Sequence, residues 1–199
     1  MSTRILIGFV ISLMSLTSMA QADAERAEAI VTSKCFICHG LAGESSSRQY
    51  PKLAGQHTQY IAKQLDDFKS GRRAGDTMRA MVGDLTADDM VALGRFFESK
   101  RLEPDVPSDP ALTKLGSQVF FTGHKDGKLP ACSTCHGARG YGTPLLPRLA
   151  GQRPAYLENQ LRSFTKRERT NDNAVMHDIA AQLSETEIVA VSAFLAGFD

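Results

Sequence analysis

The sequence predicts an all-α fold made of two copies of one small helical domain, and three observations support this. A five-residue segment occurs at 35–39 and again at 132–136. A second segment, Pro-Lys/Arg-Leu-Ala-Gly-Gln, occurs at 51–56 and at 147–152, so the two pairs are offset by 97 and 96 positions. Apolar residues recur at helical spacing in both copies, and no convincing pair of strands is present.

The N-terminus predicts a secretory signal peptide over residues 1–22. Arg4 gives a positive start, residues 5–16 form an apolar core, and Ala-Gln-Ala at 20–22 is a small-x-small cleavage site. The apolar core is short for a membrane-spanning helix, which needs about 20 residues, so export is favoured over an anchor. The mature chain is expected to begin at Asp23.

The mature chain divides into two domains joined by a linker. We predict domain 1 over residues 23–103, the linker over 104–110 and domain 2 over 111–199. The linker contains three prolines and few apolar residues, which is typical of a semi-rigid connection. It should restrict the relation of the domains without fusing their cores.

Domain 1 is expected to contain three main helices. Gly71 is a plausible C-terminal stop for the second, and Thr86-x-x-Asp89 resembles a capping box that starts the third. Met78 is expected in the loop between them. The predicted helices cover 23–38, 56–70 and a segment that follows Thr86.

Domain 2 repeats this plan. Ser184-x-x-Glu187 is its capping box, and residues 122–130, rich in Gly and Lys, form an insertion that domain 1 lacks. The predicted helices cover 111–121, 153–169 and a segment after Ser184 whose buried face contains Ile188, Val191, Phe194 and Leu195.

Both copies of the five-residue segment read C-x-x-C-H, the attachment signature of c-type haem. Two thiols one helical turn apart can each add to a porphyrin vinyl group, and the adjacent imidazole can then bind the iron. A zinc site and a thiol–disulfide pair are the alternatives, and the duplication behind an export signal argues against both. The predicted attachment and ligand residues are Cys35, Cys38 and His39 in one copy and Cys132, Cys135 and His136 in the other.

Composition agrees with two covalently bound haem c groups as the cofactors. All four cysteines lie in the two motifs, so none remains for a structural disulfide in an exported protein. The formal net charge of +1 shows no basic surplus of the kind that nucleic-acid binding requires. Each domain is small and rich in loops, so haem should complete its core and the apo-protein should fold poorly.

The sixth iron ligand is predicted to be Met78 in domain 1 and Met176 in domain 2. They lie 39 and 40 residues beyond the histidines of their motifs, and both begin a matching local pattern. Met81 is a local rival, but its counterpart is Ile179, which cannot bind iron. Methionine also suits iron that must cycle without rearrangement, because a thioether raises the reduction potential.

The remaining histidines are interpreted as exposed residues of loops or helix ends, because the repeat does not match them. They are His57, His124 and His177. The carbonyls of Pro51 and Pro147, 12 and 11 residues after the motif histidines, are candidates to accept the second imidazole N–H. Four arginines are candidates to neutralise the haem propionates, with solvated surface charges as the alternative interpretation: Arg72, Arg73, Arg167 and Arg169.

The two C-x-x-C-H motifs, the two P-[KR]-L-A-G-Q segments and the segments that begin at Met78 and Met176 resemble the dihaem cytochrome c4 family. The resemblance covers about residues 23–198. It implies two class I cytochrome c folds related by a pseudo-twofold axis. It also implies a periplasmic electron carrier, often associated with the membrane, between a quinol-oxidising bc-type complex and a terminal oxidase.

Two other functions remain open. The chain resembles the dihaem subunit of sulfide-oxidising flavocytochromes, which is bound permanently to a dehydrogenase. A dihaem peroxidase would need an open sixth position on one iron, and a methionine in both copies argues against it. We therefore expect an electron-transfer protein with redox protein partners rather than an enzyme.

Overall fold

Helices supply the regular structure of the chain. The computed structural model describes residues 21–106 and 109–198, so the predicted signal peptide up to residue 20 lies outside the described residues. Within those two ranges, the only β-pairing is an isolated bridge between Thr143 and Leu146. Over the same ranges, no helix is both long and apolar enough to cross a membrane. The all-α prediction is confirmed.

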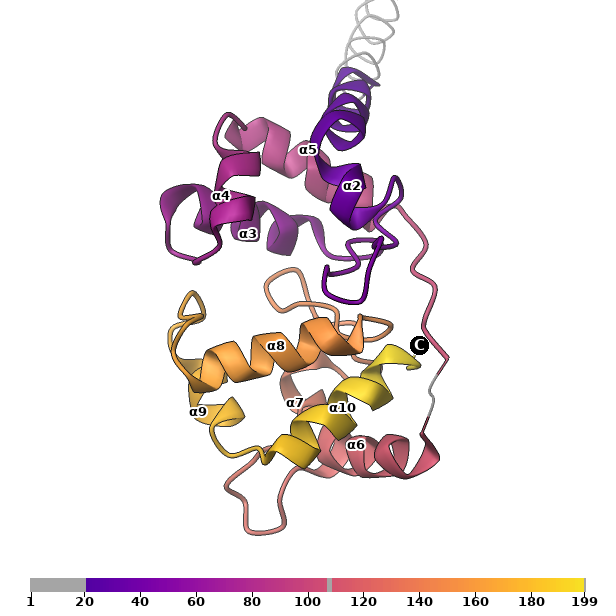
Figure 1. Ribbon diagram of the computed structural model, residues 1–199, viewed down its shortest axis with the longest axis vertical. Helices are drawn as coiled ribbons and strands as arrows, with labels where there is room; N and C mark the ends of the chain where they lie inside the picture. The colour runs from indigo at the N-terminus through magenta and orange to yellow at the C-terminus, as the bar shows by residue number, and fades with distance from the viewer. Residues whose placement is uncertain (1–20, 107–108, 199) are drawn as a thin grey trace, which may run out of the picture.

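The helices fall into two groups that match the two predicted copies (Figure 1). Residues 21–30 form a helix that continues through a π-helical segment, η1, into α2, so the first predicted helix is not regular throughout. Domain 1 contains η1 (Val31–Cys35), α2 (Phe36–His39), α3 (Thr58–Ser70), α4 (Asp76–Val82) and α5 (Ala87–Glu98). Domain 2 contains α6 (Pro110–Thr122), α7 (Ser133–His136), α8 (Pro154–Thr165), α9 (Val175–Ala180) and α10 (Glu185–Ala196).

Both predicted capping boxes are present. The hydroxyl of Thr86 accepts the N–H of Asp89 at 3.1 Å, and the Asp89 carboxylate accepts the N–H of Thr86 at 2.9 Å. Ser184 and Glu187 make the same pair of bonds at 3.3 and 2.9 Å. Each box satisfies two N–H groups that a helix start leaves without partners, so it fixes where α5 and α10 begin.

Several elements differ from the prediction. Met78 lies in the short helix α4 rather than in a loop. α3 begins at Thr58 instead of residue 56, because His57 has an extended backbone and acts as its N-cap. α8 ends before the predicted boundary, since Arg167 adopts a left-handed conformation with φ of 57°.

Each domain has its own apolar core. In domain 1 the N-terminal helix, α3 and α5 bury a cluster around Leu93 and Phe97. In domain 2, α6 and α10 cross closely at Gly116, where a Cβ atom would lie 2.0 Å from the carbonyl oxygen of Ala190. Only glycine permits that approach. The crossing brings Phe120 and Phe194 into contact, with ring centroids 5.7 Å apart.

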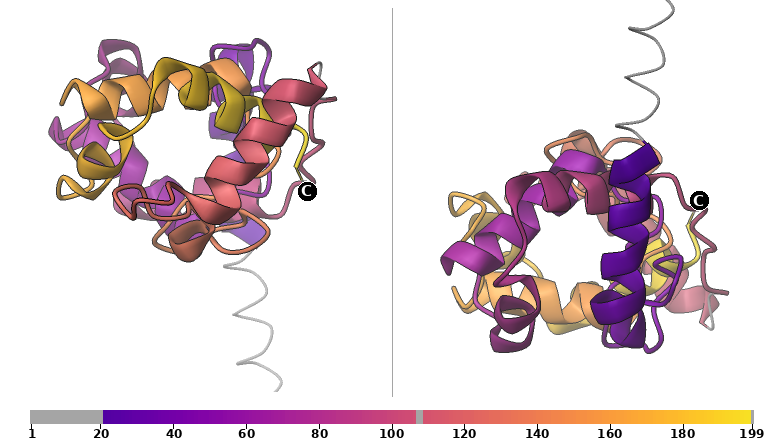
Figure 2. Two further views of the ribbon diagram at one scale, coloured as in Figure 1. Left: turned by 90° about the horizontal axis from the view of Figure 1, so that it is seen from below. Right: turned by 90° about the horizontal axis from the view of Figure 1, so that it is seen from above.

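The two domains are stacked along the long axis of the molecule, and the linker runs down one side (Figure 1). Viewed along that axis, the helices of each domain form a ring (Figure 2). Asp105 in the linker binds Lys52 of domain 1 at 2.9 Å and Arg153 of domain 2 at 2.8 Å. The linker therefore contacts both domains through one carboxylate.

Candidate haem sites

The first C-x-x-C-H motif occupies one helical turn. Cys35 ends η1, and Cys38 and His39 lie in α2 immediately after it. Gly40 has a φ of 77° and ends the helix. Both thiols are half-buried and form no disulfide. Burial raises the pKa of the Cys35 thiol to about 11.

The second motif has the same geometry in domain 2. Cys132 precedes α7, which contains Cys135 and His136, and Gly137 ends the turn with φ of 80°. Burial raises the pKa of the Cys132 thiol to about 11. Cys135 is exposed, and all four cysteines are free. The local structure therefore offers two unpaired thiols, one turn apart, in each domain.

Both motif histidines are oriented by a proline carbonyl, as the sequence suggested. Nδ1 of His39 lies 3.0 Å from the oxygen of Pro51, and Nδ1 of His136 lies 3.1 Å from the oxygen of Pro147. A carbonyl oxygen only accepts, so Nδ1 carries the proton and Nε2 keeps its lone pair. Burial lowers the pKa of both imidazoles, which are each 7 % exposed. Each ring is thus held neutral, in the tautomer that binds a metal through Nε2.

The predicted methionines lie on the short helices that follow α3 and α8. Met78 is half-buried in α4 and packs against the domain 1 core, which Cys35 also contacts. Its rival Met81 is 42 % exposed, and Met90 is buried in that core at 4 % exposure. Met176 is half-buried in α9. The burial therefore favours Met78 over Met81.

These side chains fit haem c in each domain. Two free thiols, one imidazole Nε2 and one thioether are the groups that covalent attachment and six-coordinate iron require. A zinc site would instead need several converging ligands. Across the described residues, no group of three or more His, Cys, Asp or Glu side chains converges in that way.

The other histidines are not simply exposed, so that interpretation was wrong. His57 is half-buried, and its Nε2 lies 2.7 Å from the Tyr141 carbonyl of the other domain. Nε2 of His124 lies 2.7 Å from Glu187, which ties the insertion to α10. Nδ1 of His177 lies 2.9 Å from the carbonyl of Phe164. All three are engaged by protein groups that the repeat could not reveal.

A buried polar cluster at the domain interface was also missed. Arg73 donates to Tyr156 at 3.1 Å and to Gln160 at 2.8 Å, both in the other domain. Arg169 makes the equivalent bonds from domain 2 to domain 1. The partners of Arg169 are Tyr60, at 3.0 Å, and Gln64, at 3.2 Å. The tyrosine and glutamine pairs match in the repeat, which was the available signal, but nothing in the sequence placed them together.

The four candidate propionate-binding arginines now separate into two kinds. Arg73 and Arg169 are buried, each 9 % exposed, and stack on Phe68 and Phe164. Arg72 is on the surface and pairs with Asp66 and Asp67, while Arg167 contacts His177. Burial favours Arg73 and Arg169 as the arginines that neutralise the haem propionates, because a buried cation needs a nearby anion.

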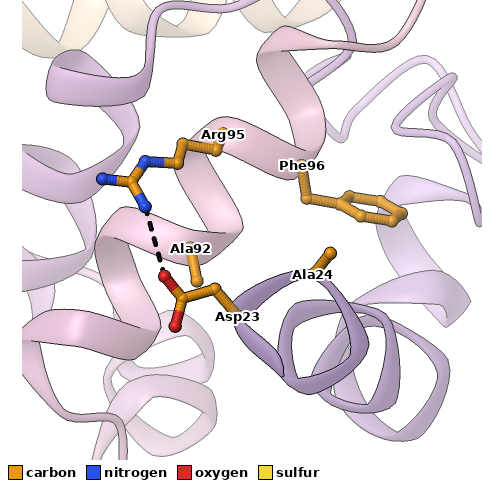
Figure 3. A pocket seen from close by; sticks show the side chains of 5 residues that line it. All are labelled: Asp23, Ala24, Ala92, Arg95 and Phe96. Atoms are coloured by element: carbon orange, nitrogen blue, oxygen red, sulfur yellow. Dashed lines mark hydrogen bonds and ion pairs between the residues drawn. The ribbon is translucent and has the colours of Figure 1, made fainter. Parts of the chain in front are cut away.

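A small cavity lies elsewhere, between the N-terminal helix and α5 (Figure 3). It has a volume of about 170 Å³ and is lined by Asp23, Ala24, Ala92, Arg95 and Phe96. Asp23 and Arg95 form an ion pair at 3.2 Å across it. None of the predicted haem-binding residues lines this cavity.

Comparison with known proteins agrees with the repeat. The cytochrome c family model matches residues 24–99 and 113–198. A cytochrome c4 from Thiocapsa roseopersicina is 40% identical over 179 residues, which cover 88% of this chain and 92% of the relative. A thiosulfate dehydrogenase electron acceptor from Stutzerimonas stutzeri strain A1501 is 34% identical, over 81% of this chain and 77% of that protein.

A solved structure gives the same result. The reduced recombinant cytochrome c4 from Pseudomonas stutzeri superposes with a TM-score of 0.83 at 36% identity. The match covers 88% of this chain and 98% of that one. The duplicated motifs, the tandem helical domains and these matches together show that the chain belongs to the cytochrome c4 family and carries two covalently bound haem c groups.

Proposed function

We propose that this electron-transfer protein carries one electron on each of two six-coordinate haems. His39 and Met78 would hold the iron in domain 1, and His136 and Met176 would hold it in domain 2. The observation that carries the proposal is the buried imidazole beside each Cys-x-x-Cys pair, with Nδ1 bound to a proline carbonyl. When bound, haem supplies the redox couple, and the chain attaches it, orients its ligands and excludes water.

Carbon monoxide tests the ligand assignment, because reduced iron binds it at a vacant position. We expect the dithionite-reduced protein to keep its spectrum in CO. Met78→Leu should bind CO at one haem, whereas Met81→Leu, which changes a neighbouring exposed methionine, should behave as the wild type. Prompt CO binding by half the haem of the wild type would refute one of the methionine assignments and favour a peroxidase or sensor.

The finer proposal is a periplasmic carrier between a quinol-oxidising bc-type complex and a terminal oxidase. The predicted signal peptide and the family membership support it. The mass of the purified mature protein should correspond to a chain that begins at Asp23 plus two haems. Stopped-flow mixing should show reduction by a bc-type complex and oxidation by a terminal oxidase, and failure of either step would contradict this placement.

A second candidate is the acceptor of a periplasmic dehydrogenase, either soluble or as a permanent subunit as in the flavocytochromes. The relative described as a thiosulfate dehydrogenase electron acceptor favours it. Reduction by a thiosulfate dehydrogenase faster than by the bc-type complex would establish this candidate. Co-purification with a flavoprotein at constant stoichiometry would identify a flavocytochrome subunit.

A further inference from the structure

Two glutamines reach across the domain interface and bind the backbone of the opposite domain. Gln152 of domain 2 accepts the N–H of Lys52 at 2.7 Å and donates to its carbonyl at 2.9 Å. Gln56 of domain 1 accepts the N–H of Arg148 at 2.9 Å and donates to its carbonyl at 3.0 Å. Both are the last residue of the repeated P-[KR]-L-A-G-Q segment. The two contacts are thus equivalent and run in opposite directions across the interface.

The backbone N–H that each glutamine binds belongs to a peptide group whose carbonyl also binds a motif histidine. The N–H of Lys52 and the carbonyl of Pro51 are the two ends of one planar, conjugated amide. That carbonyl accepts Nδ1–H of His39 at 3.0 Å. One amide therefore connects the side chain of Gln152 to the imidazole of the other domain.

The same connection exists in the opposite direction. The N–H of Arg148 and the carbonyl of Pro147 form one amide, and that carbonyl accepts Nδ1–H of His136 at 3.1 Å. Gln56 binds its N–H end. Each domain therefore contributes a glutamine to the hydrogen-bond chain that ends on the other domain's histidine.

Because both hydrogen-bond chains are buried, a change at the glutamine end should affect the histidine at the other end. Gln56 and Gln152 are 6 and 4 % exposed, and the histidines are each 7 % exposed. Hydrogen bonds in series polarise one another, and more so where water is excluded. An acceptor on the amide N–H makes the carbonyl oxygen at the far end more negative. That oxygen then draws more strongly on the imidazole N–H, which makes Nε2 a better electron donor.

We propose that Gln152 tunes the reduction potential of the domain 1 haem and that Gln56 tunes that of the domain 2 haem. Both act as positioning residues through one peptide group. The inference rests on the proposed roles of His39 and His136 as iron ligands. A more electron-rich imidazole favours oxidised iron, so each glutamine lowers the potential of the haem in the opposite domain.

The test measures both midpoint potentials by spectroelectrochemistry in the holoprotein, with each haem assigned by NMR. We expect Gln152→Leu to raise the potential of the domain 1 haem and leave the other unchanged, and Gln56→Leu to do the reverse. A threefold change in the oxidation equilibrium corresponds to about 28 mV for a one-electron couple. An effect on the glutamine's own domain, or equal effects on both haems, would overturn the proposal.

A matched control weakens the interface without touching either amide chain. Asp105→Asn removes the charge that binds the side chains of Lys52 and Arg153. It should move neither haem selectively. If Asp105→Asn shifts the potential of one haem and not of the other, as a glutamine variant should, then loosening of the domain interface explains the effect and the proposal is wrong.

A measurement on the wild type keeps the proposal testable if a leucine variant does not fold. Coupling is reciprocal, so oxidation of the domain 1 haem should strengthen the bond from the Lys52 N–H to Gln152. We expect hydrogen exchange of that amide to be slower in the oxidised protein. Equal exchange in both redox states would refute the coupling. CO binding by the wild type would instead refute the methionine ligands and leave this result interpretable.

Discussion

Asp89 shows how one residue can start a helix and join two elements. It is 5 % exposed and accepts hydrogen bonds from the backbone and hydroxyl of Thr86. It also binds Arg26 of the N-terminal helix at 2.8 Å. Arg26 and Thr86 hold the pKa of its carboxyl well below the usual range, although burial opposes this. In domain 2, Glu187 has the corresponding position, with His124 as its partner.

This depressed pKa predicts a dependence of stability on pH. A carboxylate with a lowered folded pKa stabilises the protein above its unfolded pKa, about 3.9, and the contribution is lost as the pH falls further. Asp89→Asn should cost about 1–3 kcal/mol of the free energy of unfolding at pH 7, and less at pH 3. Urea unfolding followed by circular dichroism measures both. Asp88→Asn, which changes an exposed neighbour, should show neither effect.

At the scale of elements, the crossing of α6 and α10 is set by Gly116. The backbones approach so closely that a methyl group there would meet the carbonyl of Ala190. Interiors are packed to near crystal density, so such an overlap forces helices apart. Gly83, at the end of α4, has room for a side chain. A Cβ atom there would lie 3.6 Å from its nearest neighbour, the carbonyl oxygen of Arg79, and the φ of Gly83 is −57°.

We therefore predict opposite effects for two glycine-to-alanine changes. Gly116→Ala should destabilise domain 2 by about 1–3 kcal/mol, because the overlap must be relieved by moving α6 or α10. Gly83→Ala should be neutral or stabilise by up to about 1 kcal/mol, since alanine narrows the unfolded ensemble. Thermal unfolding of the holoprotein reports both, and equal melting temperatures for the two variants would contradict the argument.

At the scale of the whole molecule, each domain has its own apolar core and its own C-x-x-C-H motif. The clusters around Phe97 and Phe120 share no residue. Domains of this size bury little apolar surface by themselves, so a bound porphyrin should supply much of the core. The domains are then joined by polar contacts and by the linker carboxylate of Asp105.

Haem removal from one domain should therefore unfold that domain alone. Cys132→Ser with Cys135→Ser should lose one haem and about half of the helical circular dichroism signal. Thr134→Ala, inside the same motif, should keep both haems and the full signal. A doubly substituted protein that retained full helicity and melted cooperatively would show that the apolar clusters suffice without haem.

The sequence predicted the parts of the molecule that local chemistry determines. The C-x-x-C-H spacing placed thiols and imidazole on one turn, and the capping boxes located the starts of α5 and α10. The carbonyls of Pro51 and Pro147 were found because both copies share them. The short helices α4 and α9 were not predicted, since helices of seven and six residues show little periodicity.

The interface could not be predicted from the sequence. The sequence showed Gln56 and Gln152 only as matching positions of the repeated segment. Their contacts depend on how the two domains stack. His57 looked like an exposed helix-end residue because its carbonyl partner, Tyr141, is 84 positions away. Contacts of this kind follow from tertiary placement, which no local pattern encodes.

The mirror-image contacts of Gln56 and Gln152 give the interface the self-complementary character of a homodimer, although both halves belong to one polypeptide. In a dimer, dilution would separate the partners, and one change in the gene would alter both sides at once. Here the linker fixes the local concentration of each half for the other, so pairing is independent of protein concentration. Each half can also mutate alone, as Phe36-Ile37 against Ser133-Thr134 shows, so the two redox centres are free to diverge.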